Sequence, residues 1–305
     1  MVIDINVYIM NKLEGYSDCP DFKNILAGVV TLYYPRLEYL HNIRTYAEYL
    51  GTVYIVDNTP DSNKEFKAEL SVAIPHAKYV SEMNNHGVAH ALNLGLEAAR
   101  KDGYRWLLTM DQDSSFTPAQ AARYFSSINN HRDENVAILS PSHSTPEEDD
   151  GPCVYVEKDI VWTSGNMVDV NMAEAIGGFD EKLFIDSVDH EYCLRAKLKG
   201  YKILQARNCF MTHEVGDERL VGFRKRKKRS FHSPKRMYFM IRNTFYISEL
   251  YGNDFVKFFK RHKKELRKEY IRVMKYSSER RLYLYYTIKA WIDFKKGVFG
   301  NSVGL

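Results

Sequence analysis

Long apolar runs, internal repeats and low-complexity tracts are absent from this chain of 305 residues. A membrane-spanning helix needs about 18 or more consecutive apolar residues, and no stretch approaches that length. Residues 1–14 lack both the basic start and the continuous apolar stretch of a secretion signal. We therefore expect a cytoplasmic protein whose length allows a sizeable buried core.

Cysteine is scarce, and the spacing of the four cysteines indicates no shared chemistry. They are Cys19, Cys153, Cys193 and Cys209. None of them forms the paired spacing that is typical of a zinc knuckle or a redox dithiol. We expect reduced thiols without a special role.

The net charge is only +4, but the basic residues are unevenly distributed. Residues 224–229 form an uninterrupted basic run, and Phe255, Phe258 and Phe259 alternate with further cations in a stretch of helical rhythm. Three explanations stay open: a solvated face, a site for anionic lipid headgroups, and nucleic-acid binding. Packing against the rest of the protein would explain the aromatic residues equally well.

Short apolar runs alternate with helical stretches from residue 25 onward. The expected strands cover residues 25–32, 53–56, 77–80, 106–110 and 136–139, and the expected helices cover 36–50, 87–100 and 186–200. This order predicts an α/β fold with a Rossmann-like, mainly parallel sheet flanked by helices. Asp57 and Asp111 directly follow two of the strands. Because ligands gather at the carboxyl ends of such strands, we expect both acids to face one crevice.

The character of the chain changes near residue 222, after which it is basic, aromatic and helical in rhythm. We predict three parts: a leader segment over residues 1–24, an α/β domain over 25–222 and a helical extension over 223–305. The α/β domain is the expected place of ligand binding, because both strand-end acids lie in it.

Two carboxylates, Asp111 and Asp113, flank Gln112 where a predicted strand ends. Carboxylate oxygens are hard ligands for Mg²⁺ or Mn²⁺, and such an ion can neutralise a diphosphate. An acid-x-acid triplet also arises by chance in a chain of this length and composition. Its position at the end of an apolar strand is what favours a metal and diphosphate site.

A second group of acids surrounds the start of the helix expected at residue 186. Its members are Asp180, Glu181, Asp186, Asp189 and Glu191. Carboxylates in a first turn complement the helix dipole, which is one explanation of the group. A general base must be presented at a fixed point beside a crevice, and a first turn offers such a point. Both explanations stay open on the residues alone.

Taken together and in order, six segments of the chain resemble the family 2 inverting glycosyltransferases of GT-A fold. The segments are residues 29–35, 55–58, 85–95, 111–114, 162–165 and 177–195, and the resemblance extends over about residues 25–245. The chain is most similar to bacterial rhamnosyltransferases, which have a similar Met-Asp-Gln-Asp-Ser step and a Phe-Ile-Asp-x-Val-Asp-x-Glu segment. Their His-Ser-Pro-x-Arg-x-Tyr block corresponds to residues 232–238, which Arg242 and Asn243 follow.

The resemblance implies a donor site at the ends of the strands. Asp57 would recognise the nucleotide base, and Asn85 with Gly87 would shape the nucleotide pocket. Asp111 would contact the ribose or the metal, Asp113 the metal, and His213 could reach the metal or the diphosphate. The other donor-binding candidates are Thr31, Tyr33, Pro35 and Gln112.

The resemblance also implies a base and an acceptor side. With the segment aligned on Arg195, Asp189 takes the place of the catalytic base. Many relatives have Glu-Asp where this chain has Val188 and Asp189, so the assignment stays open to Asp186. The candidates on the acceptor side are Trp162, Ser164, Gly165, Asp186 and Glu191.

The function implied is a Mg²⁺- or Mn²⁺-dependent inverting transfer of L-rhamnose from dTDP-L-rhamnose to a hydroxyl of a cell-surface polysaccharide, such as capsule or O-antigen, or of a lipid-linked glycan precursor. A UDP-sugar donor, carrying galactose or an N-acetylhexosamine, is the alternative within the family. A non-enzymatic module that binds membranes or nucleic acid is the alternative outside it. We expect contact with the cytoplasmic face of the membrane and no nucleic-acid partner.

Overall fold

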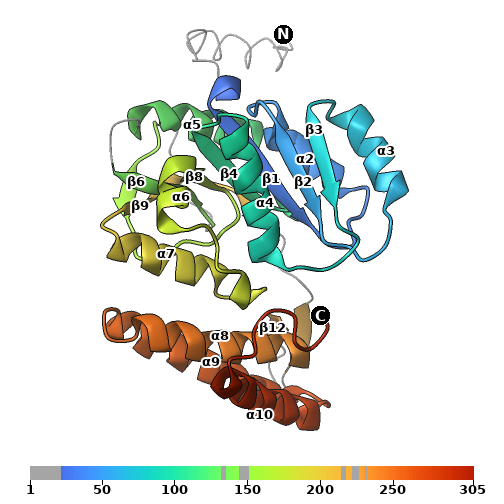
Figure 1. The fold of residues 1–305 in the computed structure, drawn as a ribbon, viewed down its shortest axis with the longest axis vertical. Coiled ribbons are helices and arrows are strands. Elements are labelled where there is room, and N and C mark those ends of the chain that lie inside the picture. Colours follow the sequence, from blue (N-terminus) through green and yellow to red (C-terminus); the bar gives the residue numbers. More distant parts are fainter. Residues whose placement is uncertain (1–21, 132–134, 144–150, 214–217, 222–226, 231) are drawn as a thin grey trace, which may run out of the picture.

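The computed structural model describes residues 22–131, 135–143, 151–213, 218–221, 227–230 and 232–305. Within these residues, a sheet with helices on both faces forms one part of the molecule, and three long helices pack together beside it (Figure 1). A turn of 3-10 helix, η2 (Phe22–Asn24), leads into the first strand.

In the described part of the chain, eight strands form one sheet in the order β3-β2-β1-β4-β8-β6-β9-β7. Their bounds are β1 (Leu26–Leu32), β2 (Val53–Asp57), β3 (Ala77–Ser81), β4 (Trp106–Asp111), β6 (Val136–Ser142), β7 (Tyr155–Glu157), β8 (Asn166–Asp169) and β9 (Lys202–Phe210). β1 pairs in parallel with β2 and β4, β2 with β3, and β6 with β9. The predicted α/β fold with a mainly parallel sheet is therefore confirmed. β8 is antiparallel to both β4 and β6, and β7 is antiparallel to β9.

Helices cover both faces of the sheet, which explains why β1 is buried along its whole length. α2 (Tyr39–Ala47), α3 (Lys64–Ala73) and α5 (Pro118–Ser126) share one hydrophobic core with β1 residues such as Leu26 and Val30. α4 (Val88–Lys101), α6 (Val170–Ile176) and α7 (Val188–Leu198) share the other core with Ala27 and Val29. Successive β1 side chains thus point to opposite faces.

The observed helices agree with the predicted ones to within a few residues at each end. α4 and α7 differ from the ranges 87–100 and 186–200 by one or two residues at each end, and α2 is shorter than 36–50. Ser187 precedes α7 as its N-cap residue, and Gly200 beyond its end has φ +82°. Short 3-10 turns, η3 (Ser127–His131) and η4 (Glu181–Leu183), complete this part.

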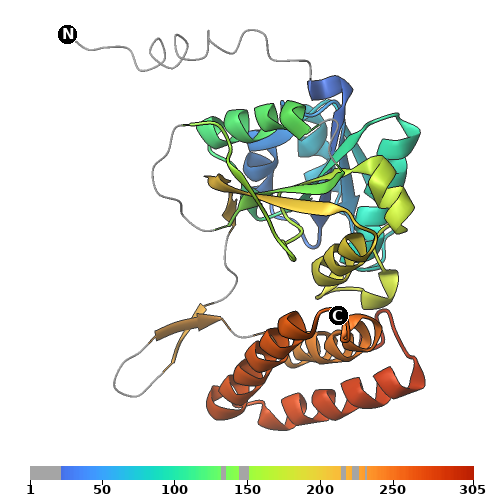
Figure 2. The same cartoon turned by 90° about the vertical axis from the view of Figure 1, so that its left-hand side faces the viewer.

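The long helices α8 (Pro234–Tyr251), α9 (Val256–Tyr276) and α10 (Arg280–Lys296) lie against one another on the side of α7 (Figures 1 and 2). They share a third hydrophobic cluster, but Ile247 and Tyr251 of α8 belong to the core beneath α7. The division at residue 222 stays a prediction, and the leader over residues 1–24 lies mostly outside the described residues.

The three phenylalanines at the start of α9 pack inward. Phe259 is buried, and Phe255 and Phe258 pack against the same core as α7. Residues 224–226 of the basic run lie outside the described residues, and the backbone of β12 (Lys227–Ser230) pairs with β11 (Glu218–Val221). Among the described residues, no helix has the length and apolar character needed to cross a membrane.

The expectation of reduced thiols is wrong for two of the cysteines. Cys153 and Cys209 form a disulfide, with their Cα atoms 5.8 Å apart. The antiparallel pairing of β7 with β9 brings the two residues together, although 56 positions separate them in the sequence. Cys193 is a free, buried thiol whose pKa burial raises to about 12, and Cys19 lies outside the described residues.

Candidate glycosyl-transfer site

The two strand-end acids lie at the same edge of the sheet, on either side of β1. In the strand register, Thr31 is the partner of Asp111 and Leu32 is the partner of Asp57. The Thr31 hydroxyl donates a hydrogen bond of 3.4 Å to Oδ1 of Asp111. The expected convergence of these acids therefore follows from the parallel pairing of three adjacent strands.

A reciprocal pair of hydrogen bonds fixes the loop after β1 against the turn after β4. The Tyr33 amide donates to Oε1 of Gln112 at 3.0 Å, and Nε2 of Gln112 donates to the Tyr33 carbonyl at 3.1 Å. Asn42 of α2 donates to the Gln112 carbonyl at 3.1 Å. In the same loop, Pro35 lies two residues after Tyr33 and is half-buried. The Gln112 side chain thus fixes the backbone of Tyr33 at the strand-end edge of the sheet.

Asp57 is almost completely buried and accepts hydrogen bonds at both of its oxygens. The Thr59 amide donates to Oδ1 at 2.8 Å, and the Tyr79 hydroxyl donates to Oδ2 at 2.6 Å. Burial, followed by the hydrogen bond to Asp57, raises the pKa of Tyr79 above its ordinary value. Asp57 therefore stabilises the end of β2, and its contact with a nucleotide base stays a prediction.

The start of α4 joins the strand-end loops to the acidic segment. Asn85 accepts a hydrogen bond from the Gly87 amide at 3.1 Å and donates one to the Leu305 carbonyl at 3.0 Å. Gly87 has φ +90°, and a Cβ atom there would collide with Phe184. The Val88 amide donates to the Phe184 carbonyl at 2.7 Å. A side chain at position 87 would separate these two loops.

Residues 162–165 reach the same edge because β8 runs opposite to its neighbours, so the start of β8 lies at the end of β4. The Gly165 amide donates to the Thr109 carbonyl at 2.7 Å. Ser164 accepts from the Asp111 amide at 3.0 Å and donates to the Ser114 hydroxyl at 2.8 Å. Ser164 and Gly165 thus hold the acidic turn in place, while the indole of Trp162 is 54% exposed.

The turn that carries Asp113 also meets the segment of His213. The strand β5 (Ser114–Ser115) pairs antiparallel with β10 (Thr212–His213), and His213 is the register partner of Ser114. The backbone of His213 therefore lies next to the residue that follows Asp113. Within the described residues, no group of three or more His, Cys, Asp or Glu side chains could hold a metal ion by itself.

The segment before α7 has an unusual backbone. Phe184, Asp186 and Ser187 all have φ +64°, a left-handed conformation that costs of the order of 1–3 kcal/mol per residue without glycine. Such a segment persists only when the surrounding structure holds it. The acid candidates Asp186 and Asp189 lie within or directly after it.

Two buried residues of α8 hold this segment. Asn243 Nδ2 donates to the carbonyls of residues 183, 185 and 186 at 2.8 to 3.0 Å. Arg242, which is fully buried, donates to the carbonyls of Lys182, Leu183 and Gly300 at 2.8 to 3.1 Å. Sequence reasoning assigned no role to this pair, although it follows the His-Ser-Pro-x-Arg-x-Tyr block.

Arg236, the arginine of that block, lies among the acids of both sides. Its Nε donates to Oδ2 of Asp186 at 2.5 Å. Burial alone would lower the pKa of Arg236, but the attraction of Asp186, Asp111 and Asp189 raises it above its ordinary value. The charges at the strand end and at the start of α7 therefore both act on this guanidinium, whose hydrogen bond goes to Asp186. Its place in the block was the signal that could have identified it.

Asp186 and Asp189 differ in their partners. Asp186 forms the ion pair with Arg236, and only 16% of its side chain is exposed. Asp189 is half-buried in the first turn of α7, where its Oδ1 accepts a hydrogen bond of 2.8 Å from the His190 amide.

The assignment of Glu191 to the acceptor side is wrong, because its side chain is buried in a structural ion pair. Arg195 donates to both of its oxygens at 2.8 Å, and the Tyr251 hydroxyl donates to Oε1 at 2.6 Å. A first-turn position on α7 therefore did not predict the direction of this side chain, which points to α8.

The α/β fold of this chain, a mostly parallel sheet flanked by helices, is that of GT-A glycosyltransferases. Residues 37–171 match the family model "Glycosyl transferase family 2". The chain is 29% identical over 247 residues to the dTDP-rhamnosyl transferase RfbF of Shigella flexneri. This match covers 73% of this chain and 79% of that protein. Residues 37–171 thus form a family 2 glycosyltransferase domain, and the protein is a glycosyltransferase.

Solved structures share the fold at low sequence identity. GalNAc-T7 with UDP, GalNAc and Mn²⁺ has a TM-score of 0.57 and 12% identity, over 89% of this chain and 57% of that chain. S. aureus TarS has a TM-score of 0.54 and 14% identity, over 90% of this chain and 49% of that chain. The chain thus spans about half the length of these two proteins.

Proposed function

We propose that the protein is an inverting glycosyltransferase that moves L-rhamnose from dTDP-L-rhamnose to a hydroxyl of a cell-surface polysaccharide or a lipid-linked glycan precursor. The observation that carries this proposal is the ion pair of Arg236 with Asp186 at the start of α7, a guanidinium that the charges of Asp111 and Asp189 also attract. One site thus has a carboxylate edge for a donor and a separate carboxylate for an acceptor. The relative named as a dTDP-rhamnosyl transferase supports the donor.

Asp111 and Asp113 would hold Mg²⁺ or Mn²⁺ together with the donor phosphates. Two carboxylates fit this task, because Mg²⁺ in phosphate sites is usually held by one or two carboxylates and by the substrate itself. When bound, the ion would neutralise the negative charge of the departing diphosphate. Mn²⁺ and UDP in the GalNAc-T7 structure support this assignment, in which His213 would be a further neighbour.

Asp189 is the proposed general base. It would accept the proton of the acceptor hydroxyl while that oxygen forms a bond to the anomeric carbon and the bond from this carbon to the diphosphate breaks. One displacement of this kind inverts the anomeric configuration. The ion pair of Asp186 with Arg236 favours Asp189 for this role, because the guanidinium occupies Oδ2 of Asp186.

A cytoplasmic location at the inner membrane surface is part of the proposal. Lys257, Lys260 and Lys264 of α9 are exposed and could contact anionic headgroups, whereas Phe259 of the same helix is buried. This contact would place the enzyme beside a lipid-linked acceptor.

A donor screen tests the proposal. The protein is incubated with Mn²⁺, with dTDP-rhamnose, UDP-galactose or UDP-N-acetylglucosamine, and with a glycan library, and released nucleoside diphosphate is measured. Acceptor-dependent release from dTDP-rhamnose is expected. Calorimetric titration of dTDP and of UDP separates the two donor classes. Preferential binding of UDP would show that the donor is a UDP-sugar and not dTDP-L-rhamnose.

A further inference from the structure

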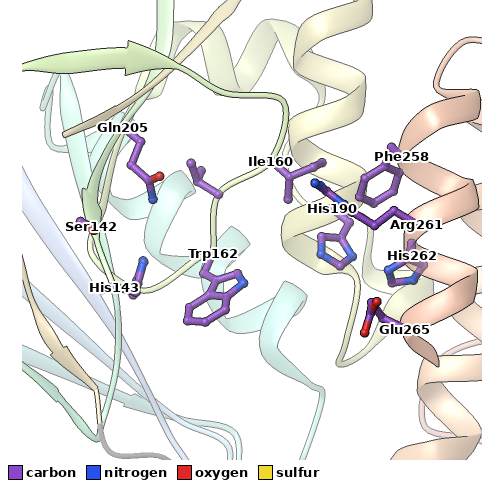
Figure 3. Close-up of a pocket in the computed structure, with 11 residues that line it drawn as sticks. Ser142, His143, Ile160, Trp162, His190, Gln205, Phe258, Arg261, His262 and Glu265 are labelled. Carbon is purple, nitrogen blue, oxygen red and sulfur yellow. The ribbon is translucent and has the colours of Figure 1, made fainter. Parts of the chain in front are cut away.

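A cavity of about 430 Å³ lies between the segment of residues 160–162 and helix α9. Its lining residues are Ser142, His143, Ile160, Val161, Trp162, His190, Gln205, Phe258, Arg261, His262 and Glu265. In Figure 3, Trp162 and His143 lie on one side of the space, and Phe258, His262 and Glu265 face it from α9. Cavities that hold small molecules have volumes of about 300–1,000 Å³.

The cavity is connected to both halves of the proposed transfer site. On one wall, a ring nitrogen of His143 lies 2.9 Å from the carbonyl of Ser164, whose hydroxyl accepts the hydrogen bond from the Asp111 amide. On another wall, His190 directly follows Asp189. The lining is thus one residue along α7 from the proposed base and one hydrogen bond from Ser164, which lies before β8.

The lining combines aromatic faces with hydrogen-bonding groups. The rings of Trp162 and His143 are 4.9 Å apart, and the rings of Phe258 and His262 stack at 5.4 Å. Aromatic faces carry partial negative charge and attract the C–H bonds on the face of a pyranose. Gln205 and Glu265 offer partners to ring hydroxyls, so the lining has both components of sugar recognition.

The charges of the lining compensate one another. Arg261 and Glu265 have opposite charges and are four positions apart on α9. Burial, helped by electrostatic repulsion from His190 and Lys263, lowers the pKa of His262 to about 4. His262 is therefore neutral near pH 7, and the lining itself has one cation, Arg261, and one anion, Glu265, which forms an ion pair of 2.7 Å with Lys268. Such a lining suits an uncharged ligand better than a diphosphate or an anionic headgroup.

We propose that this cavity binds an uncharged pyranose of the acceptor glycan, with Trp162 as the stacking platform and Arg261 and Glu265 of α9 as partners of its hydroxyls. The inference rests on the proposed transfer function. It assigns α9, which lies far beyond the matched family domain, to the selection of the acceptor.

Saturation-transfer NMR with simple glycosides tests the proposal without any donor. The probes are the methyl glycosides of rhamnose, glucose, galactose and N-acetylglucosamine, with methyl glucuronide as the anionic comparison. At least one neutral glycoside is expected to receive saturation from the wild-type protein, and Trp162→Ala should abolish that signal. Trp291→Ala is the matched control, because Trp291 is 51% exposed on α10 outside the cavity lining.

Glu265→Gln is a second variant. Glu265 is exposed on α9, so this substitution leaves the hydrophobic core unchanged. It should weaken the same glycoside signal and leave the dTDP affinity measured with Mn²⁺ unchanged. The proposal is overturned if no neutral glycoside binds, if the glucuronide binds best, or if the signal survives Trp162→Ala. If the wild-type protein does not bind dTDP, the proposed function is contradicted instead. Failure of the cavity proposal and failure of the proposed function are therefore distinguishable.

Discussion

The strand-end edge and the start of α7 present carboxylates in two different ways. At the strand-end edge, Asp111 is fixed by the register of adjacent strands and by Ser164 at the next strand. At the start of α7, a left-handed segment is held by Arg242 and Asn243, about 60 positions further along the chain. The first arrangement follows from the sheet itself. The second depends on a distant helix, so the two regions should respond differently to mutation.

The largest expected effect is on catalysis at the start of α7. Asp189→Asn should lower the rate of transfer by about 10²–10⁴-fold, because it removes the proposed proton acceptor. Calorimetry should show an unchanged affinity for dTDP with Mn²⁺, since the strand-end edge is intact. Glu181→Gln, at an exposed acid in the preceding turn, is the control and should retain activity. Unchanged turnover in Asp189→Asn would exclude Asp189 as the base.

The next effect is on stability. Asn243→Leu removes the donor to three carbonyls, of which that of Leu183 keeps a hydrogen bond from Arg242; each unsatisfied carbonyl costs about 1–3 kcal/mol. The free energy of unfolding, measured in urea, should fall by about 3 kcal/mol or more. Asn253→Leu, at an exposed position after α8, should change it little. An equal loss in both variants would show that the carbonyl contacts are not what stabilises the segment.

A smaller effect should reveal the connection between the two regions. In a double-mutant cycle of Arg236→Gln and Asp186→Asn, the effects on kcat/KM should be non-additive by about 0.5–3 kcal/mol, because the side chains form one ion pair. The same cycle at the surface pair Lys78 and Asp102 should be additive in kcat/KM. Additivity at the first pair would mean that Arg236 and Asp186 act independently.

The smallest effect concerns pH. The pKa of His262 in the folded protein is about 4, below the ordinary value of 6.5, so the unfolded chain takes up this proton first as the pH falls. The stabilising contribution is present above pH 6.5, declines as the pH falls towards about 4 and is absent below that value. Urea unfolding of His262→Gln should show a flatter pH dependence over this range, and His41→Gln, on the surface, should not. An unchanged slope would assign the dependence to other groups.

The parallel half of the sheet could be predicted from the sequence because β1, β2 and β4 are short apolar runs that end at polar turns. β8 and β9 were not predicted. β8 has only four residues, and in β9 the polar residues Gln205, Arg207 and Asn208 interrupt the apolar pattern. Buried Asn208 has a structural reason, since it accepts a hydrogen bond from the Val154 amide at 2.8 Å.

The position of Asp111 at the end of β4 was predictable from residue type and position in an element, whereas the roles of Asp111 and Asp113 stay predictions. The site was not predictable where a residue's place in it depends on the direction of its side chain or on a contact with a distant segment. Glu191 and Asp189 are two positions apart in one helix turn, yet Glu191 points into the core. The Cys153–Cys209 disulfide and the roles of Arg242 and Asn243 depend on contacts between distant segments, which periodicity does not report.

The backbone of residues 182–186 depends on α8, which lies outside the range that matches the family model. The matched range is therefore smaller than the set of residues that forms the proposed site. The family model ends at residue 171, before Asp189 and well before Arg236 and Asn243. A chain shortened before Pro234 would keep the sheet and the strand-end acids but would leave the left-handed segment without its donors. Residues 37–171 also lack β1 and β9 of the sheet, so a graft meant to keep the proposed transfer activity would need residues from both sides of the matched range, α8 included.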